Sequence, residues 1–393
     1  MRIQVIILLA SLSALSAAAV DMYLPAFPAV ATSLNISAGQ VQQTLTIYLI
    51  GLGLGQGLYG PLLDRFGRRP PLLIGLGLFI AGSLLAAFTV NIQGLLFARF
   101  LQAIGAAAGL VASRAIVTDT CDAQSSARIY SMLAQMMMIA PITAPTLGGL
   151  TLLYGDWRLI FWLLSFFGIL CLVFTLRLLP ESLPSEYRIP LSVRNTVRDY
   201  AVQLSQPAFI FYTLASGFSF GGLFIYVTIS PFIFINIFAL SPSQFGYVFA
   251  INAAGIIFVG QINLLLLKYY TALKLLFLGL IIFVGACVLL FYLVFFDLAT
   301  LWSYWLLLGL ALSMLGLIVG NVTAITLQGT QQSAGIASAA MGSIQFLLAA
   351  LIGFVFSFTT PGLTALPVAM VVLGLVAIGL CVIGAKSPAV VVE

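Results

Sequence analysis

The sequence contains no histidine, and only 6% of its 393 residues are charged. A soluble domain carries about 25% charged residues, so this composition excludes a water-soluble globular protein. The lack of histidine excludes histidine metal ligands, histidine proton relays and Ser-His-Asp triads. The cysteines form neither a CxxC motif nor a visible disulfide framework, because they stand far apart at Cys121, Cys171, Cys287 and Cys381.

Apolar residues are abundant instead, at 62% of the chain. A helix crosses the hydrocarbon core of a bilayer with about 20 mostly apolar residues. The first 20 residues could form a cleaved signal peptide, but the apolar run continues past Asp21, which favours a first spanning helix. We therefore predict an all-α membrane protein with twelve transmembrane helices, at 3–28, 41–62, 71–90, 94–116, 128–151, 159–179, 207–236, 245–267, 273–295, 300–326, 336–359 and 364–384.

These segments form two groups of six, separated by a polar stretch from Pro180 to Gln206. The sequence GQGLYGPLLDRFGRR follows segment two and GQINLLLLKYYTALK follows segment eight, so the halves echo each other weakly at equivalent places. We expect an N-terminal half at 1–179, a central linker at 180–206 and a C-terminal half at 207–393. Two six-helix repeats with a site between them are an architecture of transporters.

Basic residues predict the orientation, because cytoplasmic loops carry an excess of Lys and Arg. If the chain starts inside, the outer side receives only Arg158, whereas the inner loops, the linker and both ends receive the other basic residues that lie outside the spans. Both termini and the linker are therefore expected to be cytoplasmic.

A dense group of charges is GPLLDRFGRRP, Gly60 to Pro70, between segments two and three. Gly60 would let two helices approach closely, and Asp64 can face a helix N-terminus, where an exposed negative charge is stabilised by about 0.3–1 kcal/mol. The arginines of this loop can pair with Asp119 and Asp122 after segment four. An ordinary positive-inside loop is the alternative interpretation.

The order G-x-x-x-D-R-x-G-R-R resembles the signature loop of the major facilitator superfamily, which acts as a latch between inward-facing and outward-facing states. Arg114, near the inner end of segment four, is expected to join the latch through Asp64 or Asp119 rather than to contact substrate. The expected latch residues are Gly60, Asp64, Arg65, Gly67, Arg68, Arg69, Arg114 and Asp119.

Two further stretches support this resemblance. LLFARFLQAIGAAAG, residues 95–109, is similar to the family's motif in segment four, with Ala103 in place of a usual glycine. APITAPTLGG, residues 140–149, resembles the motif of the drug antiporters, which is associated with proton-driven export. Its small residues and prolines allow close packing and bending, and the matching positions are Pro141, Ala144, Pro145, Gly148 and Gly149, with Ala144 replacing a glycine.

DMYLPAFP, SRAIVTD and LASGFSFGGLF look like the Bcr/CflA group of bacterial drug-resistance transporters. The resemblance implies a monomer of the bacterial inner membrane that exports small, mostly apolar compounds in exchange for protons, by alternating access. Drugs of the chloramphenicol, bicyclomycin or sulfonamide type would be among its substrates. No cofactor, metal or nucleic acid is implied.

Asp21, in AAAVDMYLPAFPAV, is the only charge between Arg2 and Asp64. At 1.5 Å per residue, Asp21 lies about 12 Å and Arg99 about 9 Å below the outer surface. A lone charge there is unfavourable by about 3 kcal/mol or more on insertion scales, so the two are expected to pair or to face a wet cavity. Asp21 is the predicted proton carrier, with Arg99 as its partner and Asp119 as a weaker candidate carrier. A fixed ion pair that only joins two helices is the structural alternative.

Substrate contacts are expected from apolar and adaptable side chains with a few polar groups. For each candidate the alternative is packing or a hydrogen bond between helices. The candidates are Tyr48, Gln135, Met136, Phe220, Phe224, Tyr226, Asn252, Asn321 and Gln345.

Two other functions compete with drug export. A transporter specific for a native metabolite, such as a purine, sugar or amino acid, would need several convergent polar groups, of which the spans have few. A membrane-embedded enzyme would need a nucleophile with a base or a metal cluster, and a chain without histidine and with one deep acid offers neither.

Overall fold

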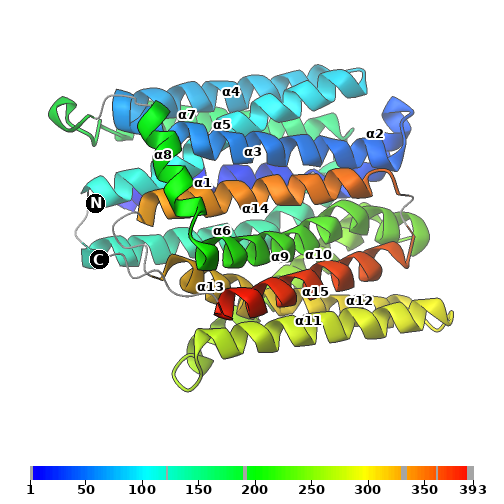
Figure 1. Ribbon diagram of the computed structural model, residues 1–393. Helices are drawn as coiled ribbons and strands as arrows, with labels where there is room; N and C mark the ends of the chain where they lie inside the picture. The colour runs from blue at the N-terminus through cyan, green and yellow to red at the C-terminus, as the bar shows by residue number, and fades with distance from the viewer. Residues whose placement is uncertain (1–2, 121–122, 189–192, 329–333, 360–361, 387–393) are drawn as a thin grey trace. The chain divides into compact units, whose positions relative to one another are not determined.

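The computed structural model describes residues 3–120, 123–188, 193–328, 334–359 and 362–386, and these residues form helices and turns with no strand among them (Figure 1). The side chains of Gln135 and Met136 lie outside this description, as does Asp122. The chain divides into two compact units, residues 1–193 with 241–247, and residues 194–240 with 248–393. Each unit is described by itself below.

In its described residues, the first unit contains the α-helices α1 to α7 and the start of α10. Within it, α4 packs against α5 and α7, α3 packs against α5, and α1 packs against α5, α6 and α7. Its helices are α1 (Ile3–Asp21), α2 (Phe27–Leu34), α3 (Ala38–Phe66), α4 (Arg69–Phe88), α5 (Ile92–Thr120), α6 (Ala123–Tyr154) and α7 (Arg158–Leu178), with short 3-10 turns η1 (Leu24–Ala26) and η2 (Ser185–Tyr187).

In the second unit, α9 packs against α13, α14 and α15, and α11 packs against α12, α13 and α15. The expected segment at 300–326 is broken at Met314, whose backbone N–H donates to the carbonyls of both Leu310 and Ala311. The helices are α8 (Val193–Leu204), α9 (Pro207–Pro231), α10 (Pro242–Leu266), α11 (Ala272–Phe295), α12 (Leu301–Ser313), α13 (Leu315–Leu327), α14 (Ala334–Phe356) and α15 (Ala365–Lys386), with a π-helical turn η3 (Phe232–Ile237); α10 begins within residues 241–247.

The helices coincide with the expected spans to within a few residues, which confirms the all-α membrane fold. Ten segments of the described chain are long and apolar enough to cross a bilayer. The two other expected spans coincide with α3 and α6, which are 29 and 32 residues long. The full count of twelve spans and the boundaries expected for the two halves remain expectations. The expected linker itself contains the helical segments η2 and α8.

Small residues let the helices of the first unit touch. A Cβ atom on Gly51 would lie 2.7 Å from the Cβ of Ala103, so α3 and α5 meet at van der Waals distance. Ala103, which replaces a family glycine, thus packs opposite a glycine. Within the first unit, no described residue of another helix lies within 4 Å of a Cβ atom placed on Gly60, so the close approach expected there stays a prediction.

The first span is broken in the middle of its charged stretch. Helix α1 ends at Asp21, η1 follows, and α2 continues to Leu34. Pro25 has no backbone N–H and restricts the residue before it, which ends a regular helix. Asp21 therefore stands at a helix end inside a 32-residue apolar segment.

Candidate functional sites

Arg99 of α5 is fully buried, at 0% exposure. Its Nη1 donates to the backbone carbonyl of Ala19 at 2.9 Å and to Oε1 of Gln102 at 2.6 Å. The last carbonyls of a helix lack an intrahelical partner, and Ala19 lies two residues before the end of α1. The break of α1 thus supplies the acceptor that Arg99 uses.

Aromatic rings surround the rest of the Arg99 guanidinium. Its central carbon lies 4.2 Å from the ring centroid of Tyr48, 4.9 Å from that of Tyr23 and 5.8 Å from that of Phe161. Each such contact contributes about 0.5–2 kcal/mol, more when water is excluded. Nε and Nη2 have no hydrogen-bond partner among the described residues. The charge is therefore held mainly by π-systems and one helix end.

Asp21 is 6% exposed, and in the described part of the chain its carboxylate makes no ion pair and no hydrogen bond. Of the two expected arrangements, a direct pair with Arg99 is therefore not formed. The expected equal depth holds, because Arg99 binds the carbonyl two residues from Asp21. Tyr48 lies within electrostatic range of both charges, and its hydroxyl donates to the carbonyl of Ser16 at 3.3 Å.

The stretch that resembles the antiporter motif, residues 140–149, packs against this end of α1. A Cβ atom on Gly148 of α6 would collide with the carbonyl of Met22, so the two backbones are in direct contact one residue after Asp21. Pro141 and Pro145 lie inside α6, where each removes a helix hydrogen bond. A bend of α6 at this stretch would therefore move backbone atoms that lie next to Asp21.

An apolar cavity of about 500 Å³ lies between α1, α6 and α7, within the usual range of ligand pockets, about 300–1,000 Å³. The hydroxyls of Thr143 and Thr151 in its wall donate to carbonyls of their own helix, at 3.1 and 2.7 Å. Sequence reasoning missed this cavity, although alanines spaced by four residues on α1 indicate it. Its lining includes Ala10, Ala14, Ala18, Met22 and Ala144.

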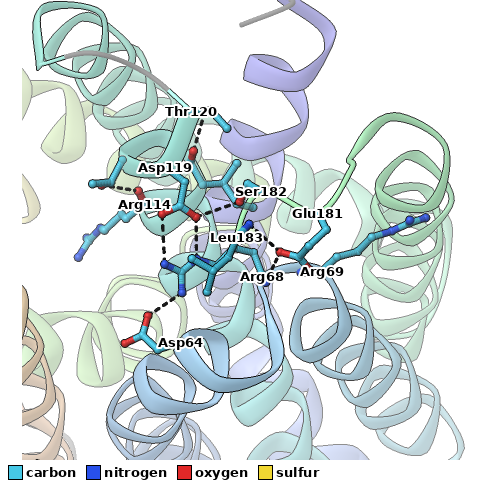
Figure 2. Close-up of polar contacts among 11 residues, drawn as sticks. Asp64, Arg68, Arg69, Arg114, Asp119, Thr120, Glu181, Ser182 and Leu183 are labelled. Atoms are coloured by element: carbon cyan, nitrogen blue, oxygen red, sulfur yellow. Dashed lines mark hydrogen bonds and ion pairs between the residues drawn. The ribbon is translucent and has the colours of Figure 1, made fainter. Parts of the chain in front are cut away.

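The second site joins the α3–α4 loop to the end of α5 (Figure 2). Arg68, 8% exposed, places Nη1 2.6 Å from Oδ1 of Asp64. Its Nε lies 2.8 Å from Oδ2 of Asp119 and its Nη2 lies 3.2 Å from Oδ1. Burial alone would lower the pKa of Arg68, but the hydrogen bonds to both carboxylates raise it. The predicted pairing of this loop with Asp119 is confirmed for Arg68.

The other arginines of the loop behave differently from the expectation. Among the described residues neither Arg65 nor Arg69 forms an ion pair: Arg65 lies 5.3 Å from the ring of Phe66, and Arg69 donates to the carbonyl of Leu176 at 2.7 Å. Arg114 lies on α5, outside this loop, and its side chain points away from Arg68 in Figure 2; its place in the latch stays a prediction. Arg68 is thus the arginine that joins Asp64 to Asp119.

Sequence reasoning missed Glu181, which follows α7. Its Oε1 accepts from the backbone N–H of Arg68 at 2.7 Å and of Leu183 at 3.0 Å, and its Oε2 accepts from that of Arg69 at 3.1 Å. Burial would raise the pKa of this carboxyl, but these donors and Arg188 lower it. An acid just after an apolar span, on the side predicted for the arginines, was the available signal.

The candidates of the second unit are held by neighbouring helices. Asn252 donates to the hydroxyl of Tyr226 at 3.0 Å and accepts from the indole N–H of Trp305 at 2.9 Å. Asn321 and Asn263 exchange hydrogen bonds at 2.8 and 3.4 Å. These contacts agree with the alternative of helix-to-helix hydrogen bonding.

Two more candidates of this unit lie on α9 and α14. Gln345 donates to Oγ of Ser216 at 2.5 Å. The rings of Phe220 and Phe224 lie 4.9 Å apart, and both face the ring of Phe346. A substrate role for these residues stays a prediction.

Comparison with known proteins gives consistent matches. A sequence profile of the Major Facilitator Superfamily matches residues 9–354. The bicyclomycin resistance protein homolog of Haemophilus influenzae is 32% identical over 88% of this chain and 87% of its own length. The chloramphenicol resistance protein of Pseudomonas aeruginosa is 30% identical over 94% of this chain and 89% of its own.

The MFS-type transporter YdgK of Bacillus subtilis is 42% identical over 65% of this chain, and the match spans 64% of that relative's length. Among solved structures, a D-xylose–proton symporter superposes with a TM-score of 0.80 over 98% of each chain. At 15% identity this likeness concerns the fold alone.

Proposed function

Because the chain belongs to the Major Facilitator Superfamily and is a multi-pass membrane transporter rather than an enzyme, we propose that it exports small, mostly apolar compounds in exchange for protons. Drugs of the bicyclomycin and chloramphenicol type are among these compounds, in keeping with the names of two relatives that cover most of its length. It works as a monomer in the bacterial inner membrane, with both termini cytoplasmic.

Asp21 carries the proton. The observation that supports this role is a buried carboxylate with no described partner, beside an arginine that is held elsewhere. A lone ionised carboxylate at this depth is unfavourable, whereas its protonated form is neutral. Protonation from outside releases the substrate, and deprotonation to the inside restores the carboxylate for the next cycle.

Arg99 keeps a fixed positive charge near Asp21 without neutralising it in an ion pair. A positive charge nearby favours the ionised carboxylate, and burial favours the protonated one. These opposing influences allow the protonation of Asp21 to respond to small changes around it. The contact of Gly148 with Met22 is the route by which a bend in α6 alters those surroundings.

The α3–α4 loop serves as the latch of the alternating-access cycle. Arg68 joins Asp64 to Asp119, and the Asp64 side chain remains 52% exposed, so its free oxygen can bind a further group. We assign that group to a helix N-terminus, where a negative charge is stabilised. Breaking and remaking this contact accompanies the change of state.

The rival function, narrow specificity for a metabolite, needs free polar groups that converge on one ligand. Asn252, Asn321 and Gln345 are instead bound to neighbouring side chains, which favours apolar substrates.

Transport in inside-out vesicles tests the proposal. Chloramphenicol uptake into vesicles that contain the purified chain should require an acidic interior and stop when a protonophore dissipates the gradient. Uptake that persists without a gradient would contradict proton coupling. A gradient-dependent uptake of a sugar or amino acid, with none of chloramphenicol, would favour the rival.

A further inference from the structure

The segment that follows α7, Pro180 to Leu183, contacts both the α3–α4 loop and Asp119. Glu181 accepts from the N–H groups of Arg68 and Arg69, at the start of α4. The next residue, Ser182, donates to Oδ2 of Asp119 at 2.9 Å, on the same oxygen that Nε of Arg68 contacts. One short segment thus binds both partners of an ion pair (Figure 2).

The loop is shaped to receive the Glu181 carboxylate. Gly67 has φ +88° and ψ 172°, a backbone conformation that is essentially restricted to glycine. A Cβ atom there would lie 2.5 Å from Oε2 and 2.7 Å from Cδ of Glu181. Gly67 therefore both makes the turn and leaves the space that the carboxylate fills.

A carboxylate at this position is also favoured electrostatically. The first N–H groups of a helix lack intrahelical partners and carry partial positive charge, so they bind an anion well. Arg188 adds a full positive charge beside Glu181. Hydrogen bonds to an ionised acceptor are about twice as strong as neutral ones, which makes Glu181 a firm anchor for the backbone of Arg68.

We propose that Glu181 is a positioning residue of the latch: it fixes the backbone of Arg68 so that the guanidinium meets Asp64 and Asp119 together, and it thereby makes the segment after α7 part of the latch. This inference rests on the proposed latch function. Glu181 does not itself contact the other half in this account, because all its described contacts lie within the first unit.

The populations of the two transport states, measured in the full chain without substrate, test the inference. Spin labels at Arg177→Cys and Tyr269→Cys, in a variant without the native cysteines, report the separation of the two halves at the predicted cytoplasmic end. Both positions are exposed, Tyr269 at 81%. Opening of the latch should increase the long-distance population in a double electron–electron resonance measurement.

Glu181→Gln keeps the size of the side chain but presents an NH₂ group to one of the three N–H donors. We expect a roughly tenfold rise in the ratio of long to short distances, as the loss of one charge-assisted hydrogen bond implies. Glu186→Gln is the matched control, because Glu186 lies five residues later in η2 and makes no hydrogen bond among the described residues. It should leave the ratio unchanged.

A double-mutant cycle with Arg68→Ala separates positioning from simple helix capping. If Glu181 acts through Arg68, Glu181→Gln should add nothing to the shift that Arg68→Ala causes alone. Equal shifts in both backgrounds, or no shift in either, would overturn the inference. If Arg68→Ala itself shifts nothing, the latch and the inference both fall. If Arg68→Ala shifts the ratio and Glu181→Gln does not, the latch stands and only the inference falls.

Ser182→Ala provides a milder variant, should Glu181→Gln fail to give monodisperse protein. It removes one hydrogen bond to Asp119 and should shift the ratio in the same direction by about twofold, as the loss of a weaker, more exposed bond implies. An unchanged ratio in this variant would contradict the claim that the segment belongs to the latch.

Discussion

Arg99 and Arg68 are both buried arginines of the first unit, at 0% and 8% exposure, yet their charges are held in different ways. Arg68 is neutralised by two carboxylates, whereas Arg99 binds a helix-end carbonyl, an amide and three aromatic faces. A neutralised arginine stabilises a fixed arrangement. An arginine held without a counter-charge leaves the nearby Asp21 available to gain and lose a proton. In the function proposed above, this difference separates the latch from the proton site.

Replacing each arginine by methionine should show the difference between the two sites most clearly, in stability and in export. Arg68→Met leaves Asp64 and Asp119 without their partner, and we expect a loss of about 1–3 kcal/mol in stability, since the site is partly exposed. Arg99→Met loses the cation–π contacts and two hydrogen bonds, but it also removes the desolvation cost of a buried charge that has no counter-ion. Because these contributions offset each other, stability should change by less than about 1 kcal/mol, while export falls about 100-fold or more. Thermal unfolding and vesicle uptake measure both quantities. Equal destabilisation by the two changes would contradict the comparison.

Gly67→Ala tests the anchoring of the latch loop. The φ of +88° and the nearby Glu181 carboxylate both oppose a Cβ atom, and we expect a destabilisation of about 1–3 kcal/mol. Gly60→Ala, seven residues earlier, is the matched control. Its Cβ would meet no described atom within 4 Å, and alanine in a helix interior is favoured over glycine by about 0.5–1 kcal/mol. Opposite signs in thermal unfolding are the predicted result.

Tyr48 separates the contribution of an aromatic face from that of a hydroxyl. Tyr48→Leu removes the ring nearest to Arg99, and we expect about a tenfold loss of export, equivalent to one cation–π contact of about 1.4 kcal/mol. Tyr48→Phe keeps the ring and loses only the 3.3 Å hydrogen bond to Ser16, so its export should remain within about twofold of the unmodified chain. Equal losses in both variants would mean that the hydroxyl, not the ring, matters.

The smallest expected effect concerns pH. The pKa of Glu181 is lowered from its ordinary value of 4.5 by the backbone donors and Arg188, against the effect of burial. A depressed carboxyl pKa contributes stability that is fully present above the ordinary value and is lost as pH falls through the folded-state value. The unfolding temperature should therefore decrease as the pH is lowered below 4.5, and this decrease should be smaller in Glu181→Gln. Identical profiles would contradict the role of the ionised carboxylate.

Much of the fold could be predicted because each span is a local feature of the chain. A run of apolar residues marks a helix by its length alone, and the pairing of Arg68 with Asp119 follows from two charges at neighbouring helix ends. The equal depth of Asp21 and Arg99 likewise follows from counting residues along two helices.

The arrangement around Arg99 could not be predicted in the same way. Tyr23, Tyr48 and Phe161 come from three separate parts of the chain, and in runs that are apolar throughout, periodicity does not show which face is buried. The acceptor at Ala19 is a backbone group that appears only because α1 ends at Asp21. The position of Glu181 after an apolar span was visible in the sequence, but its binding partners were not, because they are backbone N–H groups, which carry no sequence signature.

The central claim is that Asp21 carries the proton, and drug-induced proton release in reconstituted vesicles tests it most directly. The comparison is between the unmodified chain, Asp21→Asn and the control Asp297→Asn, whose exposed residue has a φ of 55° that asparagine tolerates well. The account predicts that Asp21→Asn folds and binds drug but releases no proton and loses gradient-driven export, while Asp297→Asn behaves as the unmodified chain. Full proton release and export by Asp21→Asn would contradict it.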